Sequence, residues 1–434
     1  MLGFNINEAK PNGIQNGWIK FIADTNAYAQ FKSALENIYV NRVNLVSKTG
    51  FSMDRELAGL FTWNVIEPQK GTFNWEMPDL AIKYAQKSNV KLSAVILPAA
   101  AWDQSGTKLS GNCQSVDFAY TDFRVGSPND LTEYENFLTQ IAKRYKGKVA
   151  VWEIGNEPDA PCGGFQTNPQ AYFDLLKVSS ETIKKADPTA KVVNGGASGH
   201  SDNNEEISFW TKFFELGGDK YIDYFNLHYN NERSQDAKLD PTTFQRVLTF
   251  FNDLMDKNGG KKPLYLTEFG IYFGTPSDQP VGQSPQAQPN QPGKPGQAPT
   301  NLSNLSEDAQ ATIYFKDSTI AFANNVNTIF IDLIGSDNNL IGSSMAFNTD
   351  NQPRLFLTTL KTIASKIDGF SKVEKIAEGQ YKFTVNGKTI YALWSGTLPN
   401  EISGKVKVTN IKGQEQTMDA AGVKLSSDQP VLVE

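Results

Sequence analysis

Short apolar runs alternate with amphipathic stretches along the chain from about residue 80 to residue 365. The apolar runs are nearly continuous, which is typical of strands buried on both faces of a parallel sheet. The stretches between them repeat their apolar residues at the period of a helix. This pattern predicts strands at residues 90–99, 148–156, 190–196, 222–230, 262–270 and 327–335, and helices at residues 132–145, 169–186, 207–217, 241–257, 307–325 and 354–367.

Strand–helix units in succession predict an α/β fold. Two more strands near the N-terminus would complete a (β/α)8 TIM barrel, which we expect to occupy residues 1–366. Three N-terminal segments compete for these two places: "LGFNIN" (2–7), "IYVNRVNLV" (38–46) and "LAGLFTWNV" (57–65). One of the three must therefore lie outside the barrel or be misassigned.

Two regions depart from the alternating pattern. Residues 274–306 contain seven prolines and six glutamines between Pro276 and Pro299, a composition that favours extended or disordered chain. This segment follows a strand on the face where barrel active sites form, so it is a wall of the site or a tolerated insertion, and we favour the insertion. Residues 367–434 contain the hairpin signal "VNGKT" and predict a small all-β, sandwich-like domain, more suited to packing than to sugar binding.

Composition excludes several function classes. The net charge is −6 and no basic stripe is present, so a nucleic-acid partner is not expected. Two His and two Cys offer too few ligands for a zinc or iron site, and phosphate-binding motifs are absent, so we expect no metal and no cofactor. The sequence contains no apolar stretch long enough for a membrane span.

Two glutamates end predicted strands. Glu157 closes the strand "VWEIGNEPD" (151–159), and Glu268 lies in "YLTEFG" (265–270). Cleavage of a glycosidic bond needs two carboxyl groups, one on either side of the bond. Glu157 ends the fourth strand of the predicted barrel and Glu268 ends the seventh, and these two strands face each other across the barrel mouth. Glu153 shares the parity of Glu157 but lies lower in the strand, so we expect it to be structural and to need a cation, either Arg42 or Arg55.

The segments "WEIGNEP" and "LTEFG" resemble the glycoside hydrolases of clan A, a group of retaining (β/α)8 enzymes. The segment "FTWNVIEPQKGTFNWEMPD" (61–79) is similar to an early segment of several clan A families, including families 39 and 42, and the small β domain resembles family 39-like members. The resemblance implies that Glu157 is the acid/base, with a raised pKa, that Glu268 is the nucleophile, and that Asn156 binds the sugar 2-hydroxyl. It implies hydrolysis of β-glycosidic bonds in a poly- or oligosaccharide.

The sequence departs from the clan pattern in two places. In "NLHYNN", His228 has the parity for substrate contact, whereas Tyr229 points the other way unless a bulge intervenes, and Tyr272 could replace it. The eighth strand lacks the tryptophan that usually lies under the sugar, so Trp102 or Trp63 would have to supply that platform. The identity of the sugar and the choice between endo and exo cleavage stay open.

Two alternative functions are compatible with the same sequence features, and the cysteines bear on where the protein is located. A non-catalytic carbohydrate-binding barrel would keep the scaffold, and an inverting hydrolase would separate its carboxyl groups more widely. Cys113 and Cys162 lie in loops that a barrel would bring together, so we expect a disulfide and an extracellular or cell-surface protein. No signal peptide is visible in the sequence, and we expect that it has been trimmed and that the protein is a monomer.

Overall fold

The computed structural model of the protein describes most of the chain in segments. The described residues are 2–5, 33, 36, 50–56, 59–104, 126–160, 163–199, 204–230, 241–258, 260–271, 306–331 and 353–434.

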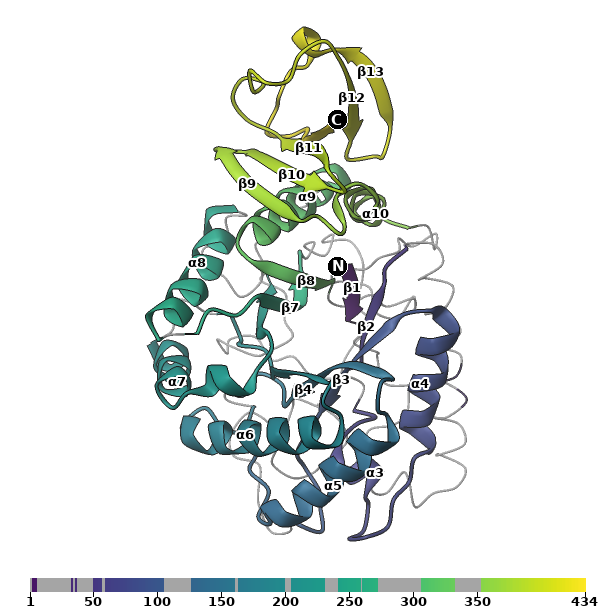
Figure 1. The fold of residues 1–434 in the computed structure, drawn as a ribbon, viewed down its shortest axis with the longest axis vertical. Coiled ribbons are helices and arrows are strands. Elements are labelled where there is room, and N and C mark those ends of the chain that lie inside the picture. The colour runs from purple at the N-terminus through teal and green to yellow at the C-terminus, as the bar shows by residue number, and fades with distance from the viewer. Residues whose placement is uncertain are drawn as a thin grey trace, which may run out of the picture.

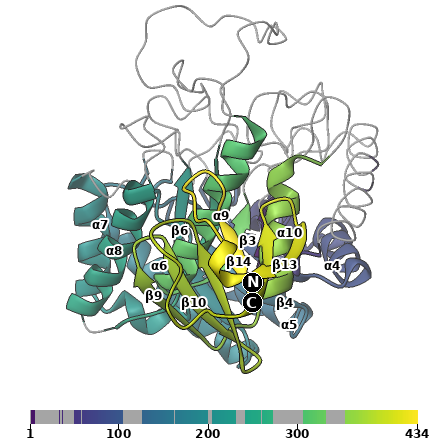
Figure 2. The ribbon, with the colours of Figure 1, turned by 90° about the horizontal axis from the view of Figure 1, so that it is seen from above.

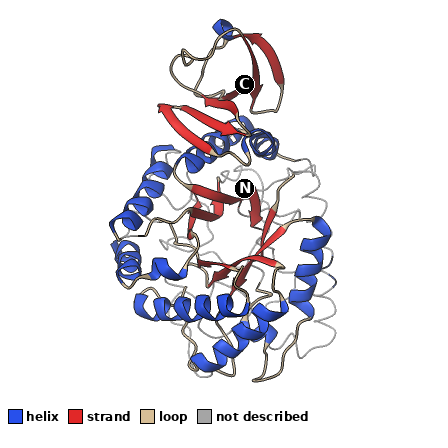
Figure 3. Ribbon diagram, viewed as in Figure 1, coloured by secondary structure: helices blue, strands red, loops and turns tan. Residues whose placement is uncertain are grey.

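The larger sheet has eight parallel strands in the order β5-β4-β3-β2-β1-β8-β7-β6. Its outer strands β5 and β6 are joined by two isolated parallel bridges, Val193 with Tyr224 and Ala197 with Leu227. Figure 3 shows these strands at the centre of the larger part of the molecule, with the helices around them. The strands are β1 (Leu2–Asn5), β2 (Met53–Glu56), β3 (Lys91–Ile96), β4 (Val149–Ile154), β5 (Lys191–Asn194), β6 (Phe225–Asn230), β7 (Leu264–Gly270) and β8 (Val326–Ile331).

Helices follow the strands and cover the sheet (Figure 1). Several begin at a side chain that caps the free amides of the first turn: Asp130 accepts from Thr132 and Glu133, and Ser306 accepts from Ala309. The helices are α3 (Trp63–Ile66), α4 (Glu76–Ser88), α5 (Leu131–Arg144), α6 (Pro169–Ala186), α7 (Asn204–Glu215), the 3₁₀ turn η2 (Gly218–Tyr221), α8 (Pro241–Lys257), α9 (Glu307–Ala323) and α10 (Leu355–Ile367).

The six strands and six helices predicted from residue 90 onward are confirmed, whereas the N-terminal assignment is partly wrong. Strand β1 lies in the first candidate, "LGFNIN", and the candidate at residues 38–46 lies outside the described residues. The candidate at residues 57–65 is not a strand where it is described, and the helix α3 begins within it. The second strand is instead "MDRE", whose residues Asp54, Arg55 and Glu56 are buried despite their charge. A search for apolar runs misses such a strand, because its charges are stabilised by partners that lie far away in the sequence.

The C-terminal residues form a second, antiparallel sheet in the order β13-β12-β14-β11-β10-β9, which confirms the predicted all-β character. Figures 1 and 2 show it beside α9 and α10, where Phe315 meets the edge of Trp394 at 6.2 Å between ring centroids. The predicted hairpin turn lies at Asn386 and Gly387, whose φ values of 49° and 77° suit an Asn-Gly turn. The elements of this C-terminal region are β9 (Lys372–Ala377), β10 (Gln380–Val385), β11 (Lys388–Leu393), β12 (Lys405–Asn410), β13 (Glu415–Asp419), the 3₁₀ turn η4 (Ala420–Gly422) and β14 (Val431–Val433).

Candidate active site

Strands β2, β4, β6 and β7 bring a cluster of charged side chains to one edge of the parallel sheet. Glu268 lies in β7, its register partner His228 lies in β6, and Arg55 lies in β2. Glu157 follows the end of β4. Because the carboxyl ends of parallel strands meet at the same edge, residues from four distant parts of the chain become neighbours.

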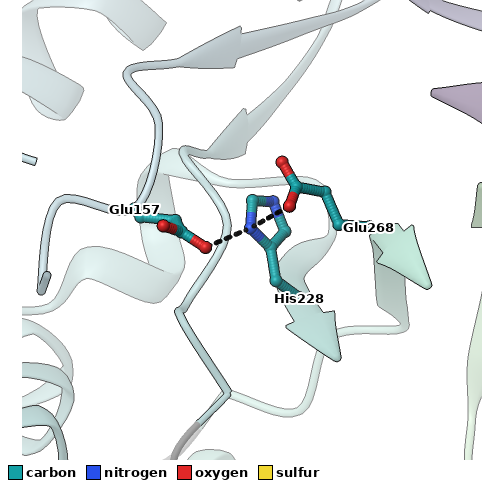
Figure 4. A group of neighbouring side chains, drawn as sticks. All are labelled: Glu157, His228 and Glu268. Atoms are coloured by element: carbon teal, nitrogen blue, oxygen red, sulfur yellow. Dashed lines mark hydrogen bonds and ion pairs between the residues drawn. The ribbon is translucent and has the colours of Figure 1, made fainter. Parts of the chain in front are cut away.

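His228 lies between the two glutamates that the sequence singled out (Figure 4). Its Nδ1 atom is 3.0 Å from Oε1 of Glu157 and 3.5 Å from Oε2 of Glu268. One oxygen of each carboxyl group and one ring nitrogen of His228 all lie within 4.8 Å of one another. The exposed fraction is 14% for the side chain of Glu157, 6% for that of Glu268 and 0% for that of His228. Of the two carboxyl groups, that of Glu157 is therefore the one more open to solvent.

Arg55 ties Glu268 to a carboxylate deeper in the sheet. Its Nε and Nη2 atoms donate to Glu153 at 2.8 and 2.6 Å, which is a bidentate pair, and its Nη1 atom donates to Oε1 of Glu268 at 3.0 Å. Nη2 also donates to Oδ1 of Asn156 at 2.9 Å. Burial disfavours the cation, but the attraction and hydrogen bonds of Glu153 and Glu268 outweigh it and raise the pKa of Arg55. The expectation that Glu153 has an arginine partner is confirmed, and that partner is Arg55.

The backbone around Glu157 departs from ordinary strand geometry. Glu157 has a φ of 43°, a left-handed conformation that is uncommon for residues other than glycine, and Gly155 has a φ of 78°. A Cβ atom on Gly163 would lie 1.7 Å from the carbonyl oxygen of Glu157, and one on Gly195 would lie 2.6 Å from the carbonyl carbon of Gly155. These glycines leave the space in which the strained turn fits. Strain of this kind concentrates at functional sites, because the surrounding structure has to hold it.

A buried carboxyl group lies two residues beyond Glu157. Oδ2 of Asp159 accepts hydrogen bonds from the backbone amide and the hydroxyl of Ser198, both at 3.0 Å, and from the indole of Trp210 at 2.8 Å. Burial and the nearby carboxylate of Glu206 raise the pKa of Asp159 to about 7, although the bonds from Trp210 and Ser198 oppose that shift. Asp159 therefore changes its charge near neutral pH.

The residues predicted to bind the sugar have different surroundings. Asn156 is partly buried and is oriented by Arg55. The ring of Tyr229 packs against Phe244 and Phe269, at 4.5 and 6.4 Å between centroids, so it faces the helical layer rather than the two carboxyl groups.

The two candidate tryptophans lie against each other. Trp63 is fully buried and meets Trp102 edge-on at 5.1 Å, so Trp63 offers no open face for a sugar. Trp102 is half-buried, and its indole donates to the backbone oxygen of Glu67 at 2.8 Å. Tyr272, Cys113 and Cys162 lie outside the described residues.

Two contacts at this site were missed by sequence reasoning. Arg55 was considered only as a partner for Glu153, although it also bonds Glu268, and Thr267 was not considered at all, although its hydroxyl lies 2.9 Å from Nε2 of His228. The available signal was an arginine between two acidic residues in "MDRE", since such a strand can be buried only with partners for its charges.

Glu157, His228 and Glu268 form a group whose ligand atoms are close enough for one metal ion. Their contacts with one another, and the bond from Arg55 to Glu268, already account for these atoms as a hydrogen-bonded cluster. The geometry is thus explained by hydrogen bonds and the Arg55 ion pair, with no need for a metal ion.

We predict that Glu153→Gln lowers the free energy of unfolding by about 3 kcal/mol, because it leaves the buried Arg55 cation without its bidentate partner. Urea denaturation at neutral pH measures this change. The same substitution at Glu401, an exposed residue paired with Lys382, should have little effect, because exposed ion pairs contribute little. Equal stabilities of the two variants would contradict the assignment of Glu153 to the buried cluster.

A second prediction concerns pH. The pKa of Asp159 is about 7 in the folded protein and 3.8 for the ordinary group, so folding takes up a proton between these values and stability falls as pH rises through this range. In Asp159→Asn this fall, worth about 4 kcal/mol in total, should be missing from urea denaturation series between pH 4 and pH 8. Glu206→Gln should instead move the fall to lower pH. Parallel curves for Asp159→Asn and the unmodified protein would rule the effect out.

Part of the chain matches a known family. The family model for Glycosyl hydrolase family 10 matches residues 58–195, a segment that includes Glu157. Over 131 residues the chain is 28% identical to endo-1,4-beta-xylanase A of Halalkalibacterium halodurans. This alignment covers 28% of this chain and 32% of the relative. The chain aligns with between 19% and 37% of the length of the curated relatives it matches.

Solved structures share the fold over the whole chain. A family 39 glycoside hydrolase from the gut symbiont Bacteroides cellulosilyticus WH2 has a TM-score of 0.64 and 16% identity, over 100% of this chain and 80% of that one. A family 39 beta-xylosidase from Caulobacter crescentus has a TM-score of 0.57 and 11% identity, over 100% and 99% of the two chains. The family match and these likenesses of fold together confirm the resemblance to clan A glycoside hydrolases, with the layout of family 39, that the sequence motifs indicated.

Proposed function

We propose that this protein is a retaining glycoside hydrolase that cleaves β-glycosidic bonds of a poly- or oligosaccharide by double displacement. The observation that carries the proposal is that oxygens of Glu157 and Glu268 lie within 4.8 Å of each other at the carboxyl edge of the sheet. Retaining enzymes hold their two carboxyl groups about 5–5.5 Å apart, whereas inverting enzymes need roughly 6.5–9.5 Å to admit a water molecule. The short separation favours the retaining scheme over the inverting one.

In this proposal Glu268 is the nucleophile. The guanidinium of Arg55 donates to Oε1, which holds the carboxyl group in position and leaves Oε2 to attack the anomeric carbon. A covalent glycosyl-enzyme forms as the bond from the anomeric carbon to the leaving-group oxygen breaks. Water then attacks the same carbon from the side that the leaving group has vacated, and the Glu268 carboxylate is released.

Glu157 is the acid in the first step and the base in the second. It gives a proton to the leaving-group oxygen, and it then takes a proton from the attacking water. Its greater exposure suits this exchange with substrate and solvent. Asn156, whose Oδ1 is held by Arg55, keeps its amide group as the donor for the sugar 2-hydroxyl.

The scaffold of the proposal is a closed (β/α)8 barrel over residues 1–366, with residues 274–306 as an insertion and residues 367–434 as a β domain. The bridges between β5 and β6 support closure, because they join the two outer strands of the sheet. Trp102 is the candidate platform under the sugar, since Trp63 is fully buried.

The substrate class is proposed from the relatives. The names endo-1,4-beta-xylanase and beta-xylosidase make β-1,4-linked xylose the first sugar to test. We further propose an extracellular or cell-surface monomer. Among the described residues, no helix has the length and apolar character to cross a bilayer.

We predict that Glu268→Gly and Glu157→Ala each lower kcat/KM by about 10⁴-fold on β-xylosides with an alkyl leaving group. With an aryl leaving group that needs no proton, the Glu157 variant should keep much more of its first-step rate than the Glu268 variant. Azide should restore turnover by forming the α-glycosyl azide in Glu268→Gly and the β-glycosyl azide in Glu157→Ala. Steady-state kinetics and NMR of the azide products measure both effects.

Glu378→Ala, at an exposed carboxylate in the turn between β9 and β10, is the matched control and should keep full activity. The panel should include β-galactosides and β-glucosides beside β-xylosides. Binding of xylan without hydrolysis of any of these substrates would support a non-catalytic carbohydrate-binding barrel instead. Initial products of inverted anomeric configuration would overturn the retaining mechanism.

The proposed location makes a separate prediction about Cys113 and Cys162. If they form a disulfide, the denatured, unreduced protein should react with no thiol reagent, and two thiols should appear after reduction. Mass spectrometry of the alkylated protein distinguishes these states. Two reactive thiols before reduction would remove this support for an oxidising compartment.

A further inference from the structure

A chain of buried polar groups leads away from His228 on the side opposite Glu157. Nε2 of His228 lies 2.9 Å from the hydroxyl of Thr267, and this hydroxyl lies 2.8 Å from Oδ1 of Asn226. Asn226 is bonded in turn to Asn194 of β5. All four side chains are fully buried, so each polar hydrogen among them must be donated to a neighbouring group of the protein.

The amide groups fix the direction of this chain. The backbone amide of Asn226 can only donate, so the atom that faces it from Asn194 at 2.6 Å is an oxygen. The backbone oxygen of Asn194 can only accept, so the atom that faces it from Asn226 at 3.1 Å is a nitrogen. Oδ1 of Asn226 therefore faces Thr267 and can only accept.

The direction of the hydrogen bond from Thr267 determines which nitrogen of His228 carries a hydrogen. A hydroxyl has one hydrogen, and that of Thr267 is directed to Asn226, so towards His228 the hydroxyl oxygen can only accept. Nε2 of His228 must then carry a hydrogen. The remaining ring nitrogen, Nδ1, is the one whose protonation can change, and it is the one that lies 3.0 Å from Glu157.

The ring is also held in place sterically. Gly196 has a φ of 67°, and a Cβ atom at this position would lie 2.1 Å from Nε2 of His228. The backbone amide of His228 donates to the oxygen of Ala197 at 2.8 Å. The imidazole therefore fits a slot that a glycine leaves open, which restricts the position of the ring.

The charged groups around Nδ1 come from every strand that meets here. Glu157 follows β4 and Glu268 lies in β7, and Glu268 is paired with Arg55 of β2. Deeper in β4, Glu153 accepts two of the four hydrogen bonds of Arg55, and Asp159 lies in the loop beyond Glu157. Among the described residues around Nδ1, Arg55 is the cation that Glu153 and Glu268 share.

We propose that Thr267, held by Asn226 and Asn194, is a positioning residue that locks His228 in the tautomer protonated at Nε2, so that the Nδ1 lone pair accepts the proton of the Glu157 acid. This inference rests on the proposed function, because it assigns Glu157 the role of the acid. The locked tautomer keeps the proton on Oε1 of Glu157 until a leaving-group oxygen replaces Nδ1 as its acceptor.

The lock helps both steps of the reaction. In the first step the proton moves from Glu157 to the leaving-group oxygen, and His228 stays neutral throughout. The resulting carboxylate then faces a lone pair at Nδ1 instead of a donor, which makes Glu157 a stronger base towards the attacking water. The opposite tautomer, with hydrogen on Nδ1, would donate to the carboxylate of Glu157. Glu157 would then lose its acid proton more easily and would be a weaker base towards water.

The tautomer can be measured without any substrate. The chain has two histidines, His200 and His228, so protein labelled with ¹⁵N-histidine gives two imidazole patterns, and His200→Gln identifies the one from His228. We expect the pattern of a ring with hydrogen on Nε2 and an unprotonated Nδ1 that accepts a hydrogen bond. In Thr267→Val, which keeps the shape of the side chain but removes the hydroxyl, the hydrogen should move to Nδ1, whereas Thr267→Ser should keep it on Nε2.

Kinetics supplies the second readout. In Thr267→Val the alkaline limb of the kcat/KM profile should move to lower pH by about one unit, and kcat/KM above pH 7 should fall about 10-fold, because Glu157 then loses its proton more easily. Thr267→Ser should restore the profile of the unmodified protein. A purely structural role of Thr267 would lower activity at all pH values alike and would leave the limb in place.

Three outcomes would overturn the inference. These are a hydrogen on Nδ1 of His228 in the unmodified protein, an unchanged tautomer in Thr267→Val, and a tautomer change without a shift of the limb. If the NMR results are as expected but no glycoside is hydrolysed, the proposed function fails while the locked tautomer stands. The spectra of folded Thr267→Val and Thr267→Ser, with matching thermal unfolding, separate these results from misfolding.

Discussion

The buried guanidinium of Arg55 is the interaction on which the site depends. It donates to Glu153, Glu268 and Asn156 from one fully buried position. A carboxylate buried without a partner would be strongly disfavoured, so Glu153 and Glu268 can occupy the sheet only because this cation lies between them. Its planar fork also fixes directions, since Nε and Nη2 donate to Glu153 while Nη1 donates to Glu268. The cation thus both stabilises the strands and orients the side chains at their ends.

The two glutamates at the mouth of the sheet differ because of their neighbours. Glu268 has a permanent cation beside it, whereas Glu157 faces a histidine and a more open side of the cluster. Different surroundings for the two carboxyl groups are what the proposed acid and nucleophile require. The strained turn at Glu157 adds a positional constraint, because the glycines around it leave little freedom for the loop.

Much of the fold could be predicted from the sequence, because the signals that specify it are local. The alternation of apolar runs and amphipathic stretches follows directly from burial of the sheet beneath a layer of helices, and the Asn-Gly turn between β10 and β11 needs only two residues. Strand β2 was the failure. Its buried residues Asp54, Arg55 and Glu56 read as a polar segment, and only partners on other strands make their burial possible.

By itself, the sequence determined the order of strands and helices and the placement of two glutamates at strand ends, since periodicity and short motifs are properties of neighbouring residues. The tertiary structure alone decided which charges pair and that His228 stands between Glu157 and Glu268. These contacts join residues that are far apart in the chain. They depend on strand order, register and bulges, which no local pattern encodes.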